Sequence, residues 1–294
     1  KGKAGPSPMD LMPEYQKFAQ DFLKQENIPP LKYRAQEAEE AHRSSKSNAP
    51  LFSKEFFEAQ MEVVVEERVP VYAAGLGNPG PWLDRLHANG TKVMAVVGAV
   101  KHAMQVVNSG IDLIVAQGHD GGGHNSPIGT MALIPQVVDA VAGRIPVLGA
   151  GGISDGRGIA AAMMLGAEGA WIGTAFLATD EAGIEDFQKE AIVESGDGDT
   201  LVSRTVTGKP ARIIRNKWSE AFVEAGLEPL PMPFQPMIAM PVLAAAAAVK
   251  RKDIAPGFAG QGMGRIHKVK PAAEVMADLV KGAESSLSRA NTYL

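Results

Sequence analysis

The chain has 294 residues, with 33 acidic against 29 basic side chains and a formal net charge of −4. This balance argues against a nucleic-acid surface, which needs clustered Lys and Arg. Because the sequence contains no cysteine, disulfides, Cys-ligated zinc, iron–sulfur clusters and thiol catalysis are excluded together. No apolar run approaches the roughly 20 residues of a membrane span. We therefore expect a cytoplasmic protein with one large α/β domain, which binds neither nucleic acid nor membranes.

The first 68 residues contain no strand-like run. Their apolar periodicity predicts helices over Met9–Gln25, Lys32–Arg43 and Ser53–Glu66, separated by proline-rich and polar stretches.

From residue 69 onward, short apolar runs alternate with helical patterns. The predicted strands cover residues 69–74, 92–97, 112–116, 146–148 and 170–172, and the helices after them begin near residues 81, 101, 130, 155 and 181. This rhythm is typical of a parallel sheet with right-handed crossovers, whose strands are buried on both faces. A doubly wound sheet and a (β/α)8 barrel both fit the rhythm. A closed barrel needs eight strands, so the barrel interpretation predicts that three strands are missing and that the chain begins just after the third.

The rhythm stops after Glu194. A polar, β-branched stretch over 200–215 is followed by predicted helices over 216–225, up to about 250, and from 271 onward. We therefore expect a partial barrel over residues 1–206, a small helical cap on the substrate side over 207–264, and a C-terminal helix over 265–294 that returns to the barrel.

The strongest local pattern is Gln117-Gly-His-Asp-Gly-Gly-Gly-His124, which follows the third predicted strand. In parallel α/β folds, ligands bind beyond the carboxyl ends of the strands. Successive glycines let the backbone approach a flat or anionic ligand, and the two histidines titrate near neutral pH. A solvent-exposed glycine loop is one alternative. Zinc bound by His119, Asp120 and His124 is another, although a loop of glycines does not hold ligands in a set geometry. We expect no metal site here.

Two further glycine turns follow the next two strands. Gly151 and Gly152 can place backbone amides on a phosphate, with the start of the following helix at Ser154/Asp155 adding its dipole. Gly173 and Thr174 end the last predicted strand. Glycine loops on the last two strands form the usual phosphate site of a barrel, which suggests a flavin mononucleotide or a sugar phosphate. A dinucleotide site is excluded, since no acidic residue ends that strand. The cluster Gly260–Gly264 follows no strand and is expected to be a tight connection.

These stretches resemble the nitronate monooxygenase family. The similar segments are IDLIVAQGHDGGGH, IPVLGAGGIS, GAEGAWIGTAFL, RTVTGKPAR, PLPMPFQ and GQGMG, in family order over about three quarters of the chain. The resemblance implies an FMN-dependent (β/α)8 barrel that oxidises alkyl nitronates with molecular oxygen to carbonyl compounds and nitrite. It implies that His124 is the catalytic base. The residues that it places on FMN are Gln117, Gly122, Gly152, Trp171, Ile172, Gly173 and Thr174, and the glycine turn after the fourth predicted strand adds Gly151.

Two departures from the family pattern stand out. The loop reads Asp120-Gly121-Gly122-Gly123-His124, where the family has Glu-Ala-Gly-Gly-His, and the family's first three strands have no counterpart. The same elements also resemble FMN-dependent enoyl-acyl carrier protein reductases and NADH:quinone reductases, so an NAD(P)H-dependent flavin reductase is the alternative. PLPMPFQ and the long cap favour nitronate oxidation. The remaining histidines, His42, His87, His102 and His267, are expected at the surface.

Overall fold

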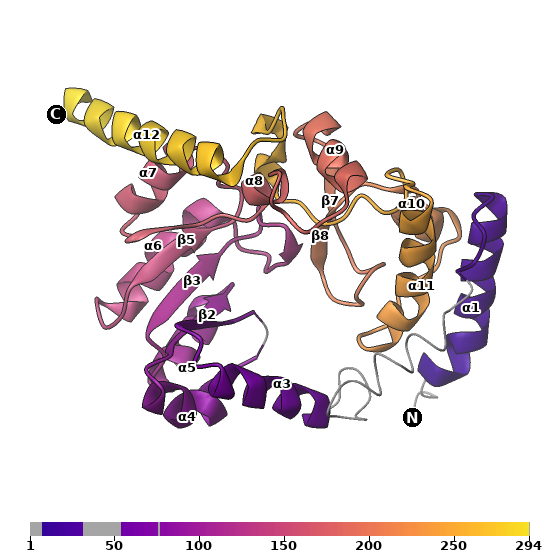
Figure 1. Cartoon of the computed structure of the whole chain (residues 1–294), viewed down its shortest axis with the longest axis horizontal. Helices are drawn as coiled ribbons and strands as arrows, with labels where there is room; N and C mark the ends of the chain where they lie inside the picture. The colour runs from indigo at the N-terminus through magenta and orange to yellow at the C-terminus, as the bar shows by residue number, and fades with distance from the viewer. Residues whose placement is uncertain (1–7, 32–53, 76, 294) are drawn as a thin grey trace, which may run out of the picture.

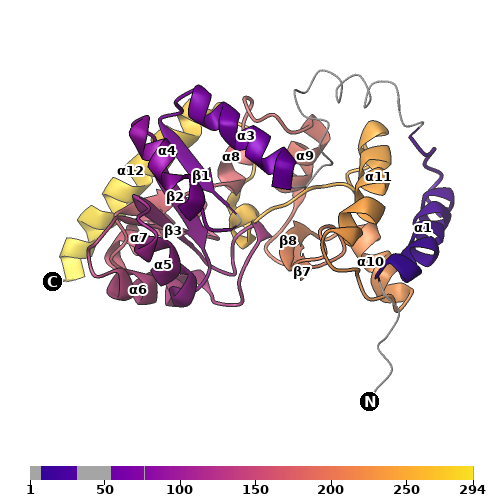
Figure 2. The same ribbon diagram turned by 90° about the horizontal axis from the view of Figure 1, so that it is seen from below.

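The computed structural model describes residues 8–31, 54–75 and 77–293. The helix expected over Lys32–Arg43 lies outside these residues. The described part has two regions: a parallel sheet with its helices, and a cap at the other end of the molecule (Figures 1 and 2). None of its helices is both long and apolar enough to cross a membrane.

The five predicted strands are present and form one parallel sheet in the order β1-β2-β3-β5-β6. Their bounds are β1 Val71–Ala74, β2 Lys92–Val97, β3 Leu113–Gln117, β5 Val147–Ala150 and β6 Gly169–Trp171. Each strand pairs with the next one of the sheet along the chain. This sequential order is that of a barrel wall, and the fold is an incomplete (β/α)8 barrel.

Helices pack along the outer side of this sheet, and the first of them extends toward the cap (Figures 1 and 2). They are α3 Lys54–Glu66, η1 Gly80–Trp82, α4 Leu83–Ala88, α5 Val100–Asn108, α6 Thr130–Val141 and α7 Gly156–Met164. Fully buried side chains such as Leu86, Ile114 and Leu133 join helices and strands into one core. α8 Thr174–Leu177 and α9 Asp186–Glu194 follow β6.

The C-terminal helix α12, Ala272–Ala290, packs along α7. The two backbones meet at Gly156 and Gly282. A Cβ atom on Gly156 would lie 2.1 Å from the amide nitrogen of Ala283, so any side chain there would push the helices apart. Short 3-10 turns, η2 Gln261–Arg265 and η3 Asn291–Tyr293, precede and follow α12.

A second, antiparallel sheet was not anticipated. It has the order β4-β8-β7, with β4 Gly123–His124, β7 Thr200–Ser203 and β8 Ala211–Ile214. The β7–β8 hairpin spans the expected boundary at residue 206, so the segment over 207–264 is not purely helical. The sequence showed the β-branched character of this stretch. It did not show that the hairpin's partner is the glycine loop, far away along the chain.

The cap consists of α10 Lys217–Glu224, α11 Phe234–Ala248 and, unexpectedly, α1 Pro8–Gln25. Residues 1–206 were expected to form the barrel, but α1 packs on the cap. Its buried side chains recur at helical spacing: Met12, Tyr15, Ala19, Phe22 and Leu23. They meet Trp218 and Phe222 of α10, with the rings of Phe22 and Trp218 5.2 Å apart. The apolar stripe predicted the helix correctly but carried no information about its partner.

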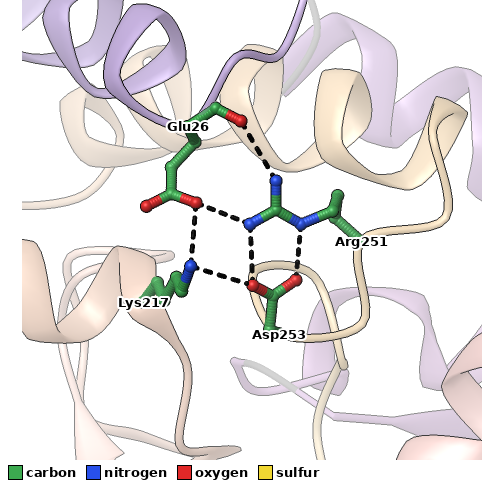
Figure 3. A network of polar contacts seen from close by, with 4 residues as sticks. All are labelled: Glu26, Lys217, Arg251 and Asp253. Carbon is green, nitrogen blue, oxygen red and sulfur yellow. Dashed lines mark hydrogen bonds and ion pairs between the residues drawn. The ribbon is translucent and has the colours of Figure 1, made fainter.

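Four charged groups join the end of α1 to the cap (Figure 3). The Glu26 carboxylate accepts hydrogen bonds from Lys217 at 3.0 Å and from Arg251 at 2.5 Å. Arg251 and Lys217 also contact Asp253. The hydrogen bond from Arg251, together with that from Lys217, holds the pKa of Asp253 at about 2. The network therefore keeps its charges at neutral pH and orients α1 on the cap.

The packing of α1 predicts the effect of Phe22→Ala. Truncation of a buried phenylalanine typically costs about 3–5 kcal/mol, so the cap should unfold at a clearly lower urea concentration. Fluorescence of Trp218, whose ring contacts Phe22, would follow the transition. Lys17→Ala is the control, because Lys17 is an exposed partner of Asp21 and such pairs contribute at most about 1 kcal/mol. Equal shifts for the two variants would contradict this packing.

Candidate functional site

A cavity of about 430 Å³ opens at the carboxyl ends of β3, β5 and β6, and we call it the glycine cavity. Its walls are Gln117, Gly121, Gly122, Gly123, Ala150, Gly151, Gly152, Ile153, Trp171, Gly173, Thr174, Leu177, Phe258 and Gly262. Seven of the eight residues predicted to hold a cofactor are among them. The exception is Ile172, which packs into the apolar cluster between α8 and α9. Its side chain is turned away because neighbours on a strand point to opposite faces.

The glycines of this cavity are required by close backbone contacts and by backbone angles. A Cβ atom on Gly122 would lie 2.7 Å from the carbonyl carbon of Ala259. Gly152 has a φ of +71°, and a Cβ there would lie 2.9 Å from that of Asp120. Gly173 differs, because a Cβ atom there would meet nothing within 4 Å. Its missing side chain leaves open space above the end of β6, where a ligand can approach the backbone.

The cluster Gly260–Gly264 is a wall of this cavity as well as the expected tight connection. The amide of Gly260 donates to Thr174 Oγ1 at 2.9 Å, and the amide of Gln261 donates to the Asp120 carbonyl at 2.9 Å. A Cβ on Gly262 would lie 2.5 Å from the Gly152 carbonyl oxygen. The glycines of this segment thus allow it to lie directly on the two turns that were predicted to bind a phosphate, Gly151-Gly152 and Gly173-Thr174. The sequence showed the glycines without showing what they contact.

We expected the N-terminus of α7 to face the cavity, but it does not. Asp155 is its N-cap, and the carboxylate accepts hydrogen bonds from the amides of Arg157 and Gly158. Since these amides are already bonded, they are not available to a phosphate. Of the groups predicted to bind a phosphate, the glycine backbone and Thr174 remain candidates, because the Thr174 hydroxyl accepts from Gly260 and retains its own proton to donate.

His124 lines a second cavity, of about 400 Å³, at the mouth of the barrel, and we call it the mouth cavity. It is bounded by the loops after β1, β2 and β3, including Gly77, Gly98 and Ser126. Gln117 lines both cavities. Its side-chain amide donates to the His124 carbonyl at 2.8 Å, so the residue shared by the two cavities also holds the histidine backbone.

The hydrogen bonds around His124 bear on its neutral tautomer. Its Nε2 lies 2.9 Å from Thr207 Oγ1, which lies 3.2 Å from the Lys209 carbonyl. In the arrangement where the Thr207 hydroxyl donates to that carbonyl, Nε2 donates to Thr207 and Nδ1 carries the lone pair. Burial, followed by the charge of Lys209, lowers the pKa of His124 below its usual value. The imidazole is therefore neutral at pH 7 and can accept a proton at Nδ1.

His119, at the other end of the loop, is used structurally. Its Nδ1 lies 2.8 Å from the Ser126 carbonyl. Its own carbonyl accepts from the guanidinium of Arg212 at 3.0 Å, and Arg212 also donates to Thr200 Oγ1. Arg212 is 3% exposed, and burial lowers its pKa although Asp120 acts in the opposite direction. Sequence reasoning quoted Arg212 in a motif but gave it no role.

The possible zinc ligands of this loop have separate partners. Asp120 accepts from the Thr130 amide at 2.9 Å, whereas His119 and His124 bond to Ser126 and Thr207. In the described part of the chain, no three His, Cys, Asp or Glu side chains gather as a metal site would require. Of the other histidines, His87 bonds to Asp112, and His102 is exposed beside the mouth cavity. His267 is exposed and His42 lies outside the described residues.

The environment of His124 predicts its titration. Its pKa should lie below about 6.5, and Lys209→Met should raise it, because a nearby cation disfavours the imidazolium. The pKa should stay below the ordinary value, since burial is the larger cause. Histidine NMR over a pH series would measure both proteins, with Lys252→Met as a control on a distant lysine. A normal pKa in the unchanged chain would contradict this geometry.

Comparisons with known proteins identify the family of this chain. A Mycobacterium tuberculosis protein named as a monooxygenase is 37% identical over 281 residues, covering 92% of this chain and 73% of that protein. A Staphylococcus saprophyticus protein named as a nitronate monooxygenase is 40% identical over 177 residues, 56% of this chain and 49% of the relative. The chain thus spans between half and three quarters of these relatives.

Two solved structures are also similar to this chain over nearly all of its length. FabK from Thermotoga maritima has a TM-score of 0.71 at 30% identity, covering 100% of this chain and 86% of that chain. Nitroalkane oxidase from Streptomyces ansochromogenes has a TM-score of 0.76 at 25% identity, covering 98% and 79%. The family model for nitronate monooxygenase matches residues 16–282. The chain therefore belongs to the nitronate monooxygenase family.

Proposed function

We propose that this protein binds FMN and oxidises alkyl nitronates with molecular oxygen to carbonyl compounds and nitrite. The observation that supports this most is the position of Gln117, which joins a glycine-lined anion site to a cavity holding a neutral histidine. A planar cofactor with a phosphate needs the first site, and a neutral nitroalkane that must lose a proton from carbon to become a nitronate needs the second site beside it. Family membership indicates a flavin oxidoreductase that acts on nitro compounds.

The glycine cavity fits the phosphate and linker of FMN. Gly173 leaves open space at the end of β6, and the hydroxyl of Thr174 faces the same cavity. The positive φ of Gly151 and Gly152 turns the backbone after β5 sharply, which can direct amide groups at an anion. At the end of β6, a dinucleotide fold would have an acidic residue, whereas this chain has Gly173-Thr174. These features favour a mononucleotide over a dinucleotide.

His124 is placed to move the proton. When bound, FMN supplies the electron chemistry with oxygen. For a neutral nitroalkane, Nδ1 of His124 would take the proton from the carbon next to the nitro group. A nitronate already lacks this proton, so it requires less from His124. Gln117 and Thr207 hold the histidine in position.

A second candidate is an NAD(P)H-dependent flavin reductase acting on enoyl thioesters or quinones. The likeness to FabK, a reductase neighbour, favours it, because the identity of 30% exceeds that to nitroalkane oxidase. Oxygen uptake with a nitronate, measured beside NADH consumption with an enoyl thioester or quinone, would separate the two. NADH consumption alone would overturn the nitronate proposal.

The cofactor proposal predicts the behaviour of Gly173→Asp. Since a Cβ atom here meets nothing, the variant should fold, but its carboxylate would repel a phosphate in the glycine cavity. We expect purified Gly173→Asp to lose most of its flavin, measured by denaturation and chromatography. Gly198→Asp is the matched control, because Gly198 also has open space around it but lies in the loop before β7. Full flavin content in Gly173→Asp, or FAD among the released flavins, would contradict the proposal.

The catalytic proposal predicts a difference between two histidine variants. Removal of a general base typically slows its step about 10²- to 10⁴-fold, so His124→Asn should lose that much activity on a neutral nitroalkane. The loss on the pre-formed nitronate should be smaller, with flavin content unchanged. His119→Asn should leave both activities largely intact. Rates from an oxygen electrode, normalised to flavin, would test this. If both substrates suffered equally from His124→Asn, the proposed role would be wrong.

A further inference from the structure

The segment over 229–235, PLPMPFQ, is one of the stretches that resemble the family, but the proposed flavin chemistry does not use it. It ends at Gln235, whose side chain is completely buried near the start of α11. A buried amide is costly unless its donors and acceptors are bonded. The partners of Gln235 therefore indicate what the segment does.

Both ends of the Gln235 amide are bonded to backbone groups. The amide nitrogen donates to the Thr205 carbonyl at 2.6 Å, and the amide oxygen accepts from the Leu230 amide at 2.9 Å. These partners assign the nitrogen and the oxygen, since exchanging them would place two donors together at Leu230 and two acceptors together at Thr205. Thr205 lies in the turn of the β7–β8 hairpin, so Gln235 joins the cap to that turn.

The indole of Trp218 donates to the same carbonyl. Its Nε1 lies 3.0 Å from the Thr205 carbonyl oxygen, and the Trp218 side chain is as deeply buried as that of Gln235. A carbonyl oxygen has two lone pairs, so it can accept both bonds at once. The turn is therefore held at Thr205 by side chains from two cap helices, α10 and α11.

The same segment also contacts the turn at Gly208. Gly208 has a φ of +79°, and a Cβ atom there would lie 2.4 Å from the Met232 amide nitrogen and 2.6 Å from the Leu230 carbonyl oxygen. The turn is closed by the Gly208 amide, which donates to the Arg204 carbonyl at 2.8 Å. The backbone of the segment thus lies directly against the turn at this residue.

Thr207 lies between these two contacts and faces His124. Its Oγ1 is 2.9 Å from Nε2 of the histidine, and the residue is buried. Because the turn is held at Thr205 and at Gly208, Thr207 has little freedom to move relative to the imidazole. A misplacement of about 1 Å in a reacting group can cost on the order of 10²-fold in rate, so the hold on this turn bears on proton transfer.

We propose that Gln235 is a positioning residue for His124, because its buried amide holds the hairpin turn that carries Thr207 to the imidazole. The inference rests on the proposed function, since it concerns the histidine that would take the proton. It makes the packing of the cap a condition for fast proton transfer. The alternative is that Gln235 only stabilises the cap, in which case the position of His124 does not depend on it.

Gln235→Met tests the inference, because methionine keeps the length of the side chain and removes both hydrogen bonds. We expect kcat on a neutral nitroalkane to fall about 10- to 100-fold, with a smaller loss on the pre-formed nitronate and unchanged flavin content. Val242→Ala is the matched control, since Val242 is also buried on α11 within the cap core. It should lower the urea midpoint of unfolding, as Gln235→Met does, but leave kcat unchanged.

Combination with Thr207→Val separates positioning from stabilisation. If Gln235 acts through Thr207, the double variant should be no slower on the nitroalkane than Thr207→Val alone, because the contact with His124 is already lost. Losses that multiply would show that Gln235 acts independently of this contact, and would overturn the inference. Equal losses of kcat in Gln235→Met and Val242→Ala would also overturn it.

Gln235→Glu covers the case in which Gln235→Met does not fold. Burial favours a protonated carboxyl, whose hydroxyl can donate to Thr205 while its carbonyl oxygen accepts from Leu230. At low pH we therefore expect Gln235→Glu to oxidise the nitroalkane nearly as fast as the unchanged protein. The ratio of the two rates should fall as the carboxylate forms at higher pH. A ratio that is low at every pH would contradict the proposal.

The nitrogen chemical shifts of the His124 imidazole, measured by NMR, give a readout that needs no substrate. In the flavin-loaded protein, Gln235→Met and Thr207→Val should change these shifts in the same direction, because both weaken the bond at Nε2, whereas Val242→Ala should not change them. If neither nitroalkane nor nitronate is oxidised, the proposed function fails, and these spectra alone decide whether Gln235 positions His124. Unchanged His124 shifts in Gln235→Met would then overturn the inference.

Discussion

The short pairing between β4 and β8 holds the candidate site together. Two residues of the glycine loop, Gly123 and His124, pair with Arg212 and Ala211 of the hairpin, so the mouth of the barrel is joined to the cap. Arg212 strengthens this junction by donating to the His119 carbonyl. A buried cation is costly unless its donors are bonded, and the bonds of Arg212 go to oxygens of the loop and of β7. The position of the loop is thus coupled to the stability of the hairpin.

This junction lets one loop serve two different cavities. Its glycines Gly121, Gly122 and Gly123 line the glycine cavity, while its last residue, His124, lines the mouth cavity. Gln117, at the end of β3, lies between them and is held by its bond to the His124 carbonyl. Because the loop leaves the carboxyl end of a buried strand, both cavities inherit the rigidity of the barrel wall. A flexible loop could not keep a neutral histidine in a fixed position beside the glycine cavity.

The sequence predicted the barrel part well because its evidence is local. Each strand is an apolar run bounded by glycine, so all five were found, whereas their order in the sheet followed from the resemblance to a barrel family. The antiparallel sheet could not be found in this way, since β4 has only two residues and its partner lies beyond residue 200. The docking of α1 is likewise nonlocal: its stripe of Phe22 and its neighbours would suit many apolar surfaces. Ile172 was grouped with Trp171 by position in a motif, although strand alternation turns its side chain away from the cavity.

The same contrast explains why motifs indicate chemistry more readily than substrate. Three positions each need one particular residue: Gly122, Gly152 and His124. A Cβ atom on either glycine would come too close to a neighbouring residue, and another ring in place of His124 would lose its hydrogen bond to Thr207. Packing residues such as Leu243 and Ile192 need only be apolar and of suitable volume, because cores tolerate such exchanges at small cost. The chemistry of a family can therefore persist in short motifs while the cap and the hairpin vary the space for the substrate. In this protein β8 pairs with the glycine loop at His124, so the hairpin and the loop are held in one sheet.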